Sequence, residues 1–148
     1  AQNLGLNLND LETFLNQKSG LLGISGQTSD IRELLKLETA GNKMAAIALE
    51  IFVYHVKKYI GAYTAALGGL DLLVFTATIG ERSFIMRSRI CNDLSALGII
   101  LDEEKNNNAI SSDSFINKGE GRVKIAVITT DEMGEMAKQV KEILKIII

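Results

Sequence analysis

Apolar residues recur at steps of three and four positions through much of the chain, which is the pattern of amphipathic helices. The longest such pattern covers about residues 43–67, and Gly68-Gly69 stops it. Four further helices are expected, over residues 9–20, 29–37, 84–97 and 131–146. The first two begin at residue types that cap helices well, Asn9-Asp10 and Ser29 or Asp30.

Short apolar runs predict strands between these helices. Residues 70–77 follow the Gly68-Gly69 turn and read Leu-Asp-Leu-Leu-Val-Phe-Thr-Ala, which is typical of a strand buried on both faces of a parallel sheet. Residues 123–128 form a second run of this kind. The other segments are expected to be a glycine-interrupted extended stretch (21–26), a loop (78–83), a brief strand (99–101) and a polar loop (102–121). This alternation of strands and helices predicts an α/β fold.

Composition narrows the class of protein. The 148 residues can form one domain with a sizeable core, and 47% hydrophobic and 23% charged residues are typical of a soluble globular protein. A net charge of −2 without a dense Lys/Arg cluster argues against a nucleic-acid partner. One cysteine and one histidine exclude a disulfide, a cysteine-based zinc site and a multi-histidine metal site. We therefore expect a cytoplasmic protein, and we expect no membrane partner because no apolar stretch reaches about 18 residues.

The first candidate site is Val74-Phe75-Thr76-Ala77-Thr78-Ile79-Gly80-Glu81. A segment that follows a buried parallel strand and leads into a helix offers backbone N–H groups to an anion or nucleotide. Gly80 allows a ligand to approach the backbone closely. The segment has neither the P-loop spacing nor the dinucleotide fingerprint. Its other interpretation is a tight turn that needs one glycine.

The second candidate is Ser25-Gly26-Gln27-Thr28-Ser29-Asp30-Ile31-Arg32, where polar groups crowd a helix start. Asp30 can accept a hydrogen bond from a ribose hydroxyl, and the Arg32 guanidinium can stack on a base or pair with phosphate. The alternative is a plain helix cap followed by a solvated arginine.

The third candidate is Ile128-Thr129-Thr130-Asp131-Glu132, which joins a strand to a helix. Carboxylates in this position can hold Mg²⁺ together with waters and substrate phosphates. They can equally complement the positive end of the helix dipole.

Other chemically distinctive residues are expected to have structural roles. His55 is interpreted as a surface or boundary residue of the long helix, and Cys91 as core packing. The basic pairs Lys57-Lys58 and Arg87/Arg89 are expected to be solvated.

Five stretches, in one order along nearly the whole chain, carry a family resemblance. They are Lys18-Ser19-Gly20-Leu21-Leu22-Gly23-Ile24-Ser25-Gly26 with Ser29-Asp30-Ile31-Arg32; Tyr59-Ile60-Gly61-Ala62-Tyr63; Val74-Phe75-Thr76-Ala77 with Ile79-Gly80-Glu81; Leu97-Gly98-Ile99 with Asp102-Glu103-Glu104-Lys105-Asn106; and Ile128-Thr129-Thr130-Asp131-Glu132. They closely resemble the acetate kinase family, over about the last third of a family chain.

The resemblance implies a place in the superfamily of acetate and sugar kinases, heat-shock ATPases and actin, whose two α/β domains enclose a cleft. Residues 1–148 would be the C-terminal, ribonuclease H-like, nucleotide-binding domain, and the N-terminal substrate half lies outside this chain. The implied reaction is reversible transfer of the γ-phosphate of ATP to acetate or another short-chain carboxylate, giving an acyl phosphate and ADP. Mg²⁺ is the implied cofactor and a homodimer the implied assembly. The isolated chain is expected to be inactive, because half a cleft cannot align the two substrates.

Site residues follow by position. Asp30, Ile31 and Arg32 match residues that line the adenosine site, and Thr78, Ile79, Gly80, Glu81 and Arg82 match the second nucleotide loop. Glu132 matches the acidic residue associated with Mg²⁺ and catalysis. Phosphoryl transfer depends on positioning and charge neutralisation, which suits these residue types.

Three departures from the family pattern leave the phosphoryl donor open. Thr78 stands where the family usually has glycine, and Arg82 where it usually has asparagine. A β-branched residue at a close-approach glycine is expected to narrow the purine pocket or to bar a positive φ. Thr129 stands where the family usually has proline. A pyrophosphate-using relative, or a non-catalytic binding module with a partly blocked site, is therefore the alternative function.

A second apolar stripe on the long helix predicts a partner. Ile47, Ile51, Tyr54 and Ala65 lie opposite the first stripe and would suit a subunit interface. The alternative is burial against other parts of the same chain.

Overall fold

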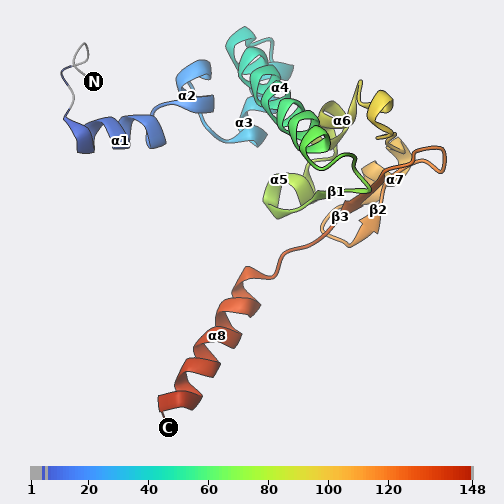
Figure 1. Ribbon diagram of the computed structural model, residues 1–148. Helices are drawn as coiled ribbons and strands as arrows, with labels where there is room; N and C mark the ends of the chain where they lie inside the picture. The colour runs from blue at the N-terminus through green and yellow to red at the C-terminus, as the bar shows by residue number, and fades with distance from the viewer. Residues whose placement is uncertain (1–4, 6, 148) are drawn as a thin grey trace. The chain divides into compact units, whose positions relative to one another are not determined.

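The computed structural model describes residue 5 and residues 7–147, and it divides into two compact units, Ala1–Leu67 and Gly68–Ile148 (Figure 1). Buried apolar side chains lie in both units, so each unit has its own core. The units are described separately. That residues 1–148 act as one nucleotide-binding domain stays a prediction.

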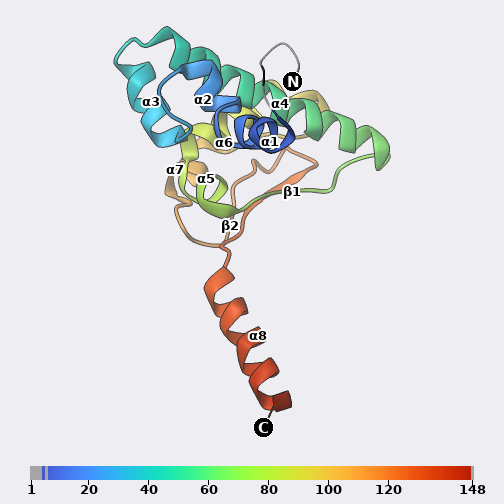
Figure 2. The ribbon, with the colours of Figure 1, turned by 90° about the vertical axis from the view of Figure 1, so that its left-hand side faces the viewer.

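The first unit is helical. Its elements are α1 (Leu8–Gln17), α2 (Gly20–Ser25), α3 (Ile31–Thr39) and α4 (Lys43–Ala66). Helices α2 and α3 both pack against α4, which runs unbroken through its 24 residues (Figure 2). The side chains of Asn7, Asp30 and Asn42 cap α1, α3 and α4 by accepting backbone N–H bonds. The three helices expected from periodicity are thereby confirmed, with α1 capped by Asn7 instead of Asn9 or Asp10 and ending at Gln17.

The extended stretch expected over residues 21–26 is wrong. These residues form most of α2, and the left-handed Gly26 (φ 64°) ends the helix as its C-cap. The helix places half-buried Leu21, Leu22 and Ile24 in a segment that packs on α4. Packing against α4 stabilises this short helix. The sequence did not predict it, because so few turns show no apolar periodicity.

The second unit combines a small sheet with helices. Its elements are β1 (Leu72–Phe75), α5 (Ala77–Arg82), α6 (Phe84–Cys91), the 3₁₀ helix η2 (Ser95–Leu97), α7 (Glu103–Asn108), β2 (Ser114–Phe115), β3 (Lys124–Val127) and α8 (Glu132–Ile147). The strand order is β1-β3-β2, with β1 parallel and β2 antiparallel to β3. The predicted α/β class and both main strands are confirmed.

Burial differs between the two parallel strands. The central strand β3 is buried on both faces, with Ile125 and Val127 fully inaccessible. The edge strand β1 leaves Leu72 44% and Val74 40% exposed, so the expectation of burial on both faces is wrong for it. An apolar run predicts a strand, but it does not reveal whether the strand lies at the edge or the centre of the sheet.

Residues 78–121 contain more regular structure than expected. The loop predicted over residues 78–83 is mostly α5, and the helix predicted over residues 84–97 ends at Cys91, before the left-handed Asp93 (φ 61°). The strand predicted over residues 99–101 is reduced to one bridge between Leu101 and Asn117. The predicted polar loop contains α7, capped by Asp102, and β2.

The predicted closing helix is present as α8. Its large apolar side chains between residues 133 and 144 recur at three- and four-residue steps and are all at least half exposed. They are Met133, Met136, Val140, Ile143 and Leu144. The apolar face of α8 therefore has no cover within the part of the chain that the structure describes.

Candidate functional site

The candidate site of the second unit lies where its two parallel strands end. Phe75 pairs with Val127 at the carboxyl ends of β1 and β3, and the Ile128 N–H donates to the Phe75 carbonyl at 2.9 Å. Residues 76–82 and 128–132 therefore leave the sheet at the same edge. In open α/β sheets this edge is where ligands bind.

Helix α5 begins directly after β1, through a strained residue. Ala77 has a φ of 58°, a left-handed conformation that costs an L-residue about 1–2 kcal/mol. Thr78 is the next residue and does not have a positive φ. This agrees with the expectation that a β-branched residue bars a positive φ at this position, and whether Thr78 narrows the purine pocket stays a prediction.

Gly80 lies within α5, which corrects its interpretation as the glycine of a tight turn. A Cβ added at Gly80 would lie 3.1 Å from the Phe75 carbonyl carbon. The glycine is thus required because α5 approaches the end of β1 closely. Whether it also admits a ligand stays a prediction.

The predicted residues of α5 divide by exposure. Thr78 and Arg82 are exposed, and Ile79 is half-buried. Glu81 is only 8% exposed, and its Oε1 accepts hydrogen bonds from the Thr130 N–H (2.9 Å) and hydroxyl (2.8 Å). These two bonds lower the pKa of Glu81 below its usual value. The carboxylate of Glu81 is thus already engaged in joining α5 to the segment that leads to Glu132.

The carboxylates of Asp131 and Glu132, at the start of α8, have different surroundings. Asp131 accepts a 2.9 Å hydrogen bond from the Gly134 N–H and so caps α8, which is compatible with the alternative interpretation that the carboxylates complement the helix dipole. Glu132 is exposed, and the described residues place no hydrogen-bond or ion-pair partner on its carboxylate. An exposed hard oxygen ligand suits Mg²⁺, which keeps several waters and takes only one or two protein carboxylates. No group of three His, Cys, Asp or Glu side chains is close enough to hold a metal among the described residues, and Mg²⁺ does not require one.

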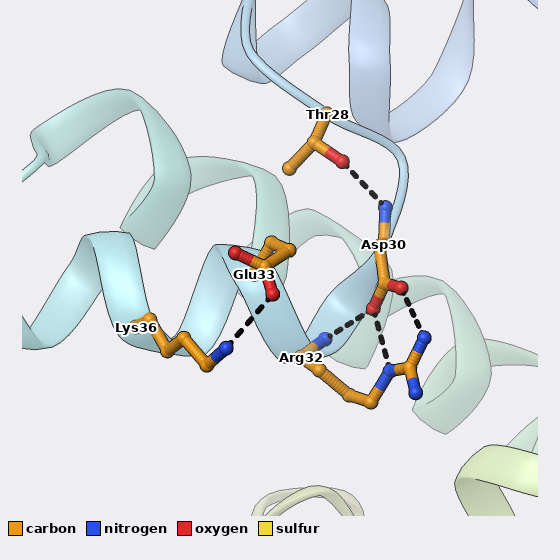
Figure 3. A network of polar contacts seen from close by, with 5 residues as sticks. All are labelled: Thr28, Asp30, Arg32, Glu33 and Lys36. Carbon is orange, nitrogen blue, oxygen red and sulfur yellow. Dashed lines mark hydrogen bonds and ion pairs between the residues drawn. The ribbon is translucent and has the colours of Figure 1, made fainter.

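In the first unit, Asp30 and Arg32 contact each other at the start of α3 (Figure 3). Asp30 caps the helix by accepting from the Arg32 N–H at 2.8 Å, and it also accepts from Nε at 3.0 Å and from Nη2. These bonds lower the pKa of Asp30 to about 2. The Arg32 side chain is 71% exposed, which leaves its Nη1 edge and both faces of the guanidinium accessible. Ile31 is 6% exposed and belongs to the core.

Arg87 corrects the prediction of a solvated side chain. It is fully buried, and all five N–H donors of its guanidinium are used. They bond to the Asn106 side chain and to the carbonyls of Gly80, Glu81, Asn106 and Ala109, at 2.7–3.0 Å. Burial lowers the pKa of Arg87 from its usual value. Arg87 therefore holds the end of α5, which carries the predicted nucleotide residues, against α7.

Spacing could have identified Arg87. It precedes the buried Ile90 and Cys91 by three and four positions, so it lies on the apolar face of α6. Asn106, its buried partner, occurred in the family-like stretches but was given no role. Cys91 is 4% exposed, as predicted for core packing, and His55 is exposed, as predicted for a surface residue.

The family model described as the acetokinase family matches residues 1–138. The chain belongs to this family. It is 44% identical over 141 residues to the acetate kinase of Bacteroides thetaiotaomicron, covering 95% of this chain and 35% of that protein. The crystal structure of Porphyromonas gingivalis acetate kinase superimposes with a TM-score of 0.87 at 38% identity, covering 97% of this chain and 36% of that one. A propionate kinase from Francisella tularensis gives a TM-score of 0.78 at 40% identity, covering 88% of this chain and 33% of that one.

Membership of the acetokinase family confirms the predicted resemblance and the ribonuclease H-like fold class. The chain spans about a third of the length of the relatives that it matches. None of the described helices is both long and apolar enough to span a membrane. The predicted site residues fall in two groups. Asp30, Ile31 and Arg32 lie in the first unit, and residues 78–82 and Glu132 lie in the second.

Proposed function

We propose that this chain provides the nucleotide- and Mg²⁺-binding part of an acetate kinase. In this reaction a carboxylate oxygen of acetate attacks the γ-phosphorus of ATP, the bond to the β-phosphate oxygen breaks, and acetyl phosphate and ADP result. The observation that carries the proposal is the shared edge of β1 and β3, where α5 and the segment leading to Glu132 are joined by Glu81 and Thr130. We assign the acetate site, as the family resemblance implies, to the part of the relatives that this chain does not span.

Each proposed site residue has a role that its environment supports. The accessible face of Arg32 stacks on the base or pairs with phosphate, and its contact with Asp30 holds the guanidinium at the start of α3. Residues Thr78 to Arg82 line the nucleotide on α5. Glu132 is the metal ligand. Mg²⁺ bound there would neutralise charge on the phosphates, which is the main requirement of phosphoryl transfer.

The proposal includes a homodimer and a cytoplasmic location, because ATP is a cytoplasmic substrate. The dimer is supported by the second stripe of α4, where Ile47 is 41%, Ile51 37% and Tyr54 65% exposed. Apolar side chains in a row on one helix face are typical of a covered surface. An Ile51→Asp variant that sediments as a monomer where the parent chain is a dimer would support this surface. A parent chain that is itself monomeric at high concentration would contradict it.

Calorimetric titration of the chain with ADP and Mg²⁺ tests the nucleotide site. Arg32→Ala and Glu132→Ala should each weaken binding about tenfold or more, because each removes a charged contact. Lys36→Ala on α3 and Glu135→Ala on α8 are matched controls, since both remove an exposed charge one turn away. They should leave the affinity unchanged. Equal losses in test and control variants would contradict the site.

The same titration with pyrophosphate separates the alternatives. Thr78 and Arg82, both exposed on α5, are the residues that would block a purine pocket. Binding of pyrophosphate without ADP would support a changed donor. Binding of neither ligand by a folded chain would support a non-catalytic module.

A further inference from the structure

Two adjacent threonines in the segment between β3 and α8 make the same unusual contact. Thr129 donates its backbone N–H (2.8 Å) and its hydroxyl (2.7 Å) to one oxygen, Asp113 Oδ1. Thr130 donates its N–H (2.9 Å) and hydroxyl (2.8 Å) to Glu81 Oε1. Four charge-assisted hydrogen bonds thus act on two consecutive residues.

The two carboxylates come from different parts of the second unit. Glu81 lies in α5, and Asp113 lies between α7 and β2. Both parts are fastened to Arg87, which donates to the Glu81 carbonyl at 3.0 Å and to the Ala109 carbonyl at 2.7 Å. The Ser111 N–H also donates to the Glu81 carbonyl, at 3.3 Å. The threonines are therefore held by groups whose own positions are fixed.

Both carboxylates are ionised at neutral pH. The hydrogen bonds from Thr129 lower the pKa of Asp113, as those from Thr130 lower the pKa of Glu81. A carboxylate that accepts two donors on one oxygen has little capacity at that oxygen for a further ligand. This argues that Glu81 Oε1 and Asp113 Oδ1 hold the protein together rather than contact a substrate.

We propose that Glu81 and Asp113 are positioning residues, which with Thr129 and Thr130 form a clamp that fixes the course of the segment leading to Glu132. The clamp begins two residues after β3 ends and stops two residues before Glu132. It therefore sets where the first carboxylate of α8 is presented relative to the edge of the sheet. The consequence for Mg²⁺ rests on the proposed function, and the clamp itself does not.

Amide hydrogen exchange on the 148-residue chain without ligand tests the clamp. The Thr129 and Thr130 amides should exchange slowly. Asp113→Ala should speed exchange at Thr129, and Glu81→Met at Thr130, each by about tenfold or more, as expected for a lost bond to a charged acceptor. Asp102→Ala is the matched control, because Asp102 also accepts a backbone N–H, that of Lys105, but does not touch this segment. It should change neither amide.

A double-mutant cycle separates the clamp from a general loss of stability. Thr129→Val removes the hydroxyl donor and, in a chain that keeps Asp113, should speed exchange of the amide at position 129. On the Asp113→Ala background it should have no further effect, because its partner is already gone. Additive effects, or fast exchange at both threonines in the parent chain, would overturn the proposal.

The consequence for the site is read by ADP affinity with and without Mg²⁺, using Asp113 because it lies outside the proposed nucleotide residues. Asp113→Ala should weaken ADP binding several-fold with Mg²⁺ and leave it unchanged in EDTA. Asp113→Asn keeps an Oδ1 acceptor and should recover part of the loss. Equal affinities with Mg²⁺, or equal losses in both media, would contradict positioning through Glu132. A parent chain with protected threonine amides that does not bind Mg²⁺ and ADP would contradict the proposed function and support the clamp.

Discussion

At the scale of single residues, we expect the buried Arg87 to contribute more to the stability of the second unit than an exposed arginine does. Arg87→Met removes all five donors from the Asn106 side chain and from the carbonyls of Gly80, Glu81, Asn106 and Ala109. We expect a loss of about 3–5 kcal/mol in the free energy of unfolding of this unit, because uncompensated buried polar groups are costly. Amide exchange of β3 measures it. Arg82→Met, at an exposed position, should change it by less than about 0.5 kcal/mol.

The contribution of Asp30 to stability should depend on pH. Its folded pKa, about 2, lies below the ordinary value, so its contribution to stability is complete above the unfolded pKa and is lost as the pH falls through about 2. Arg32→Gln removes the largest cause, the side-chain bonds from Arg32, and should raise the midpoint towards the ordinary value. Carbon-detected NMR titration of the Asp30 carboxyl measures this shift. A midpoint that stays near 2 in the variant would contradict the assignment of the cause to Arg32.

Thr129 shows how one substitution changes the local chemistry. The family resemblance implies a proline at this position, and proline has neither an N–H nor a hydroxyl to donate. The contact with Asp113 at 2.7–2.8 Å is therefore a property of the residue that this chain carries. Two hydrogen bonds restrict the segment where a proline ring would restrict φ.

At the scale of elements, periodicity predicted what extends over several turns. Helices α3, α4 and α8 were predicted nearly to their ends, because apolar spacing and capping residues agree in them. The six-residue helices α2, α5 and α7 were missed, since one or two turns show no periodicity and are held by tertiary contacts. The sequence indicated the candidate site because its segments follow predicted strands or begin predicted helices. The roles of Arg87, Asn106 and Asp113 were not predicted, because their partners lie far away in the sequence.

At the junction of β1 and α5, substitutions of Ala77 should change the stability of the second unit. Ala77→Gly should stabilise the second unit by up to about 1 kcal/mol. Glycine removes a left-handed strain of about 1–2 kcal/mol, and the greater entropy of the unfolded chain offsets about 0.5–1 kcal/mol of that gain. Ala77→Val should destabilise it, since a β-branched residue tolerates a positive φ poorly. Denaturant unfolding of the two variants beside the parent chain measures the order. A glycine variant less stable than the parent would show that the strain is absent.

At the scale of the whole molecule, each of the two compact units carries its own group of candidate nucleotide residues. Asp30 and Arg32 are held by contacts within the first unit, and Glu81, Thr130 and Arg87 by contacts within the second. Each group of candidate residues is therefore ordered by contacts within its own unit. Among the described residues, nothing covers the exposed apolar face of α8.

This division predicts recovery of activity by complementation. The chain mixed with the remaining, N-terminal portion of the Bacteroides thetaiotaomicron relative should form acetyl phosphate from acetate, ATP and Mg²⁺, whereas neither part alone should do so. Exchange protection of the α8 amides should rise in the mixture, because the apolar face of that helix gains a cover. Glu132→Gln should lower the rate by about 10²-fold or more, as expected when a charge that acts in phosphoryl transfer is removed. Glu135→Gln, the next acidic residue in the same helix, should have little effect. Protection of α8 without any turnover would mean that the parts assemble but that the nucleotide site of this chain is not functional, which would favour the non-catalytic alternative over the kinase.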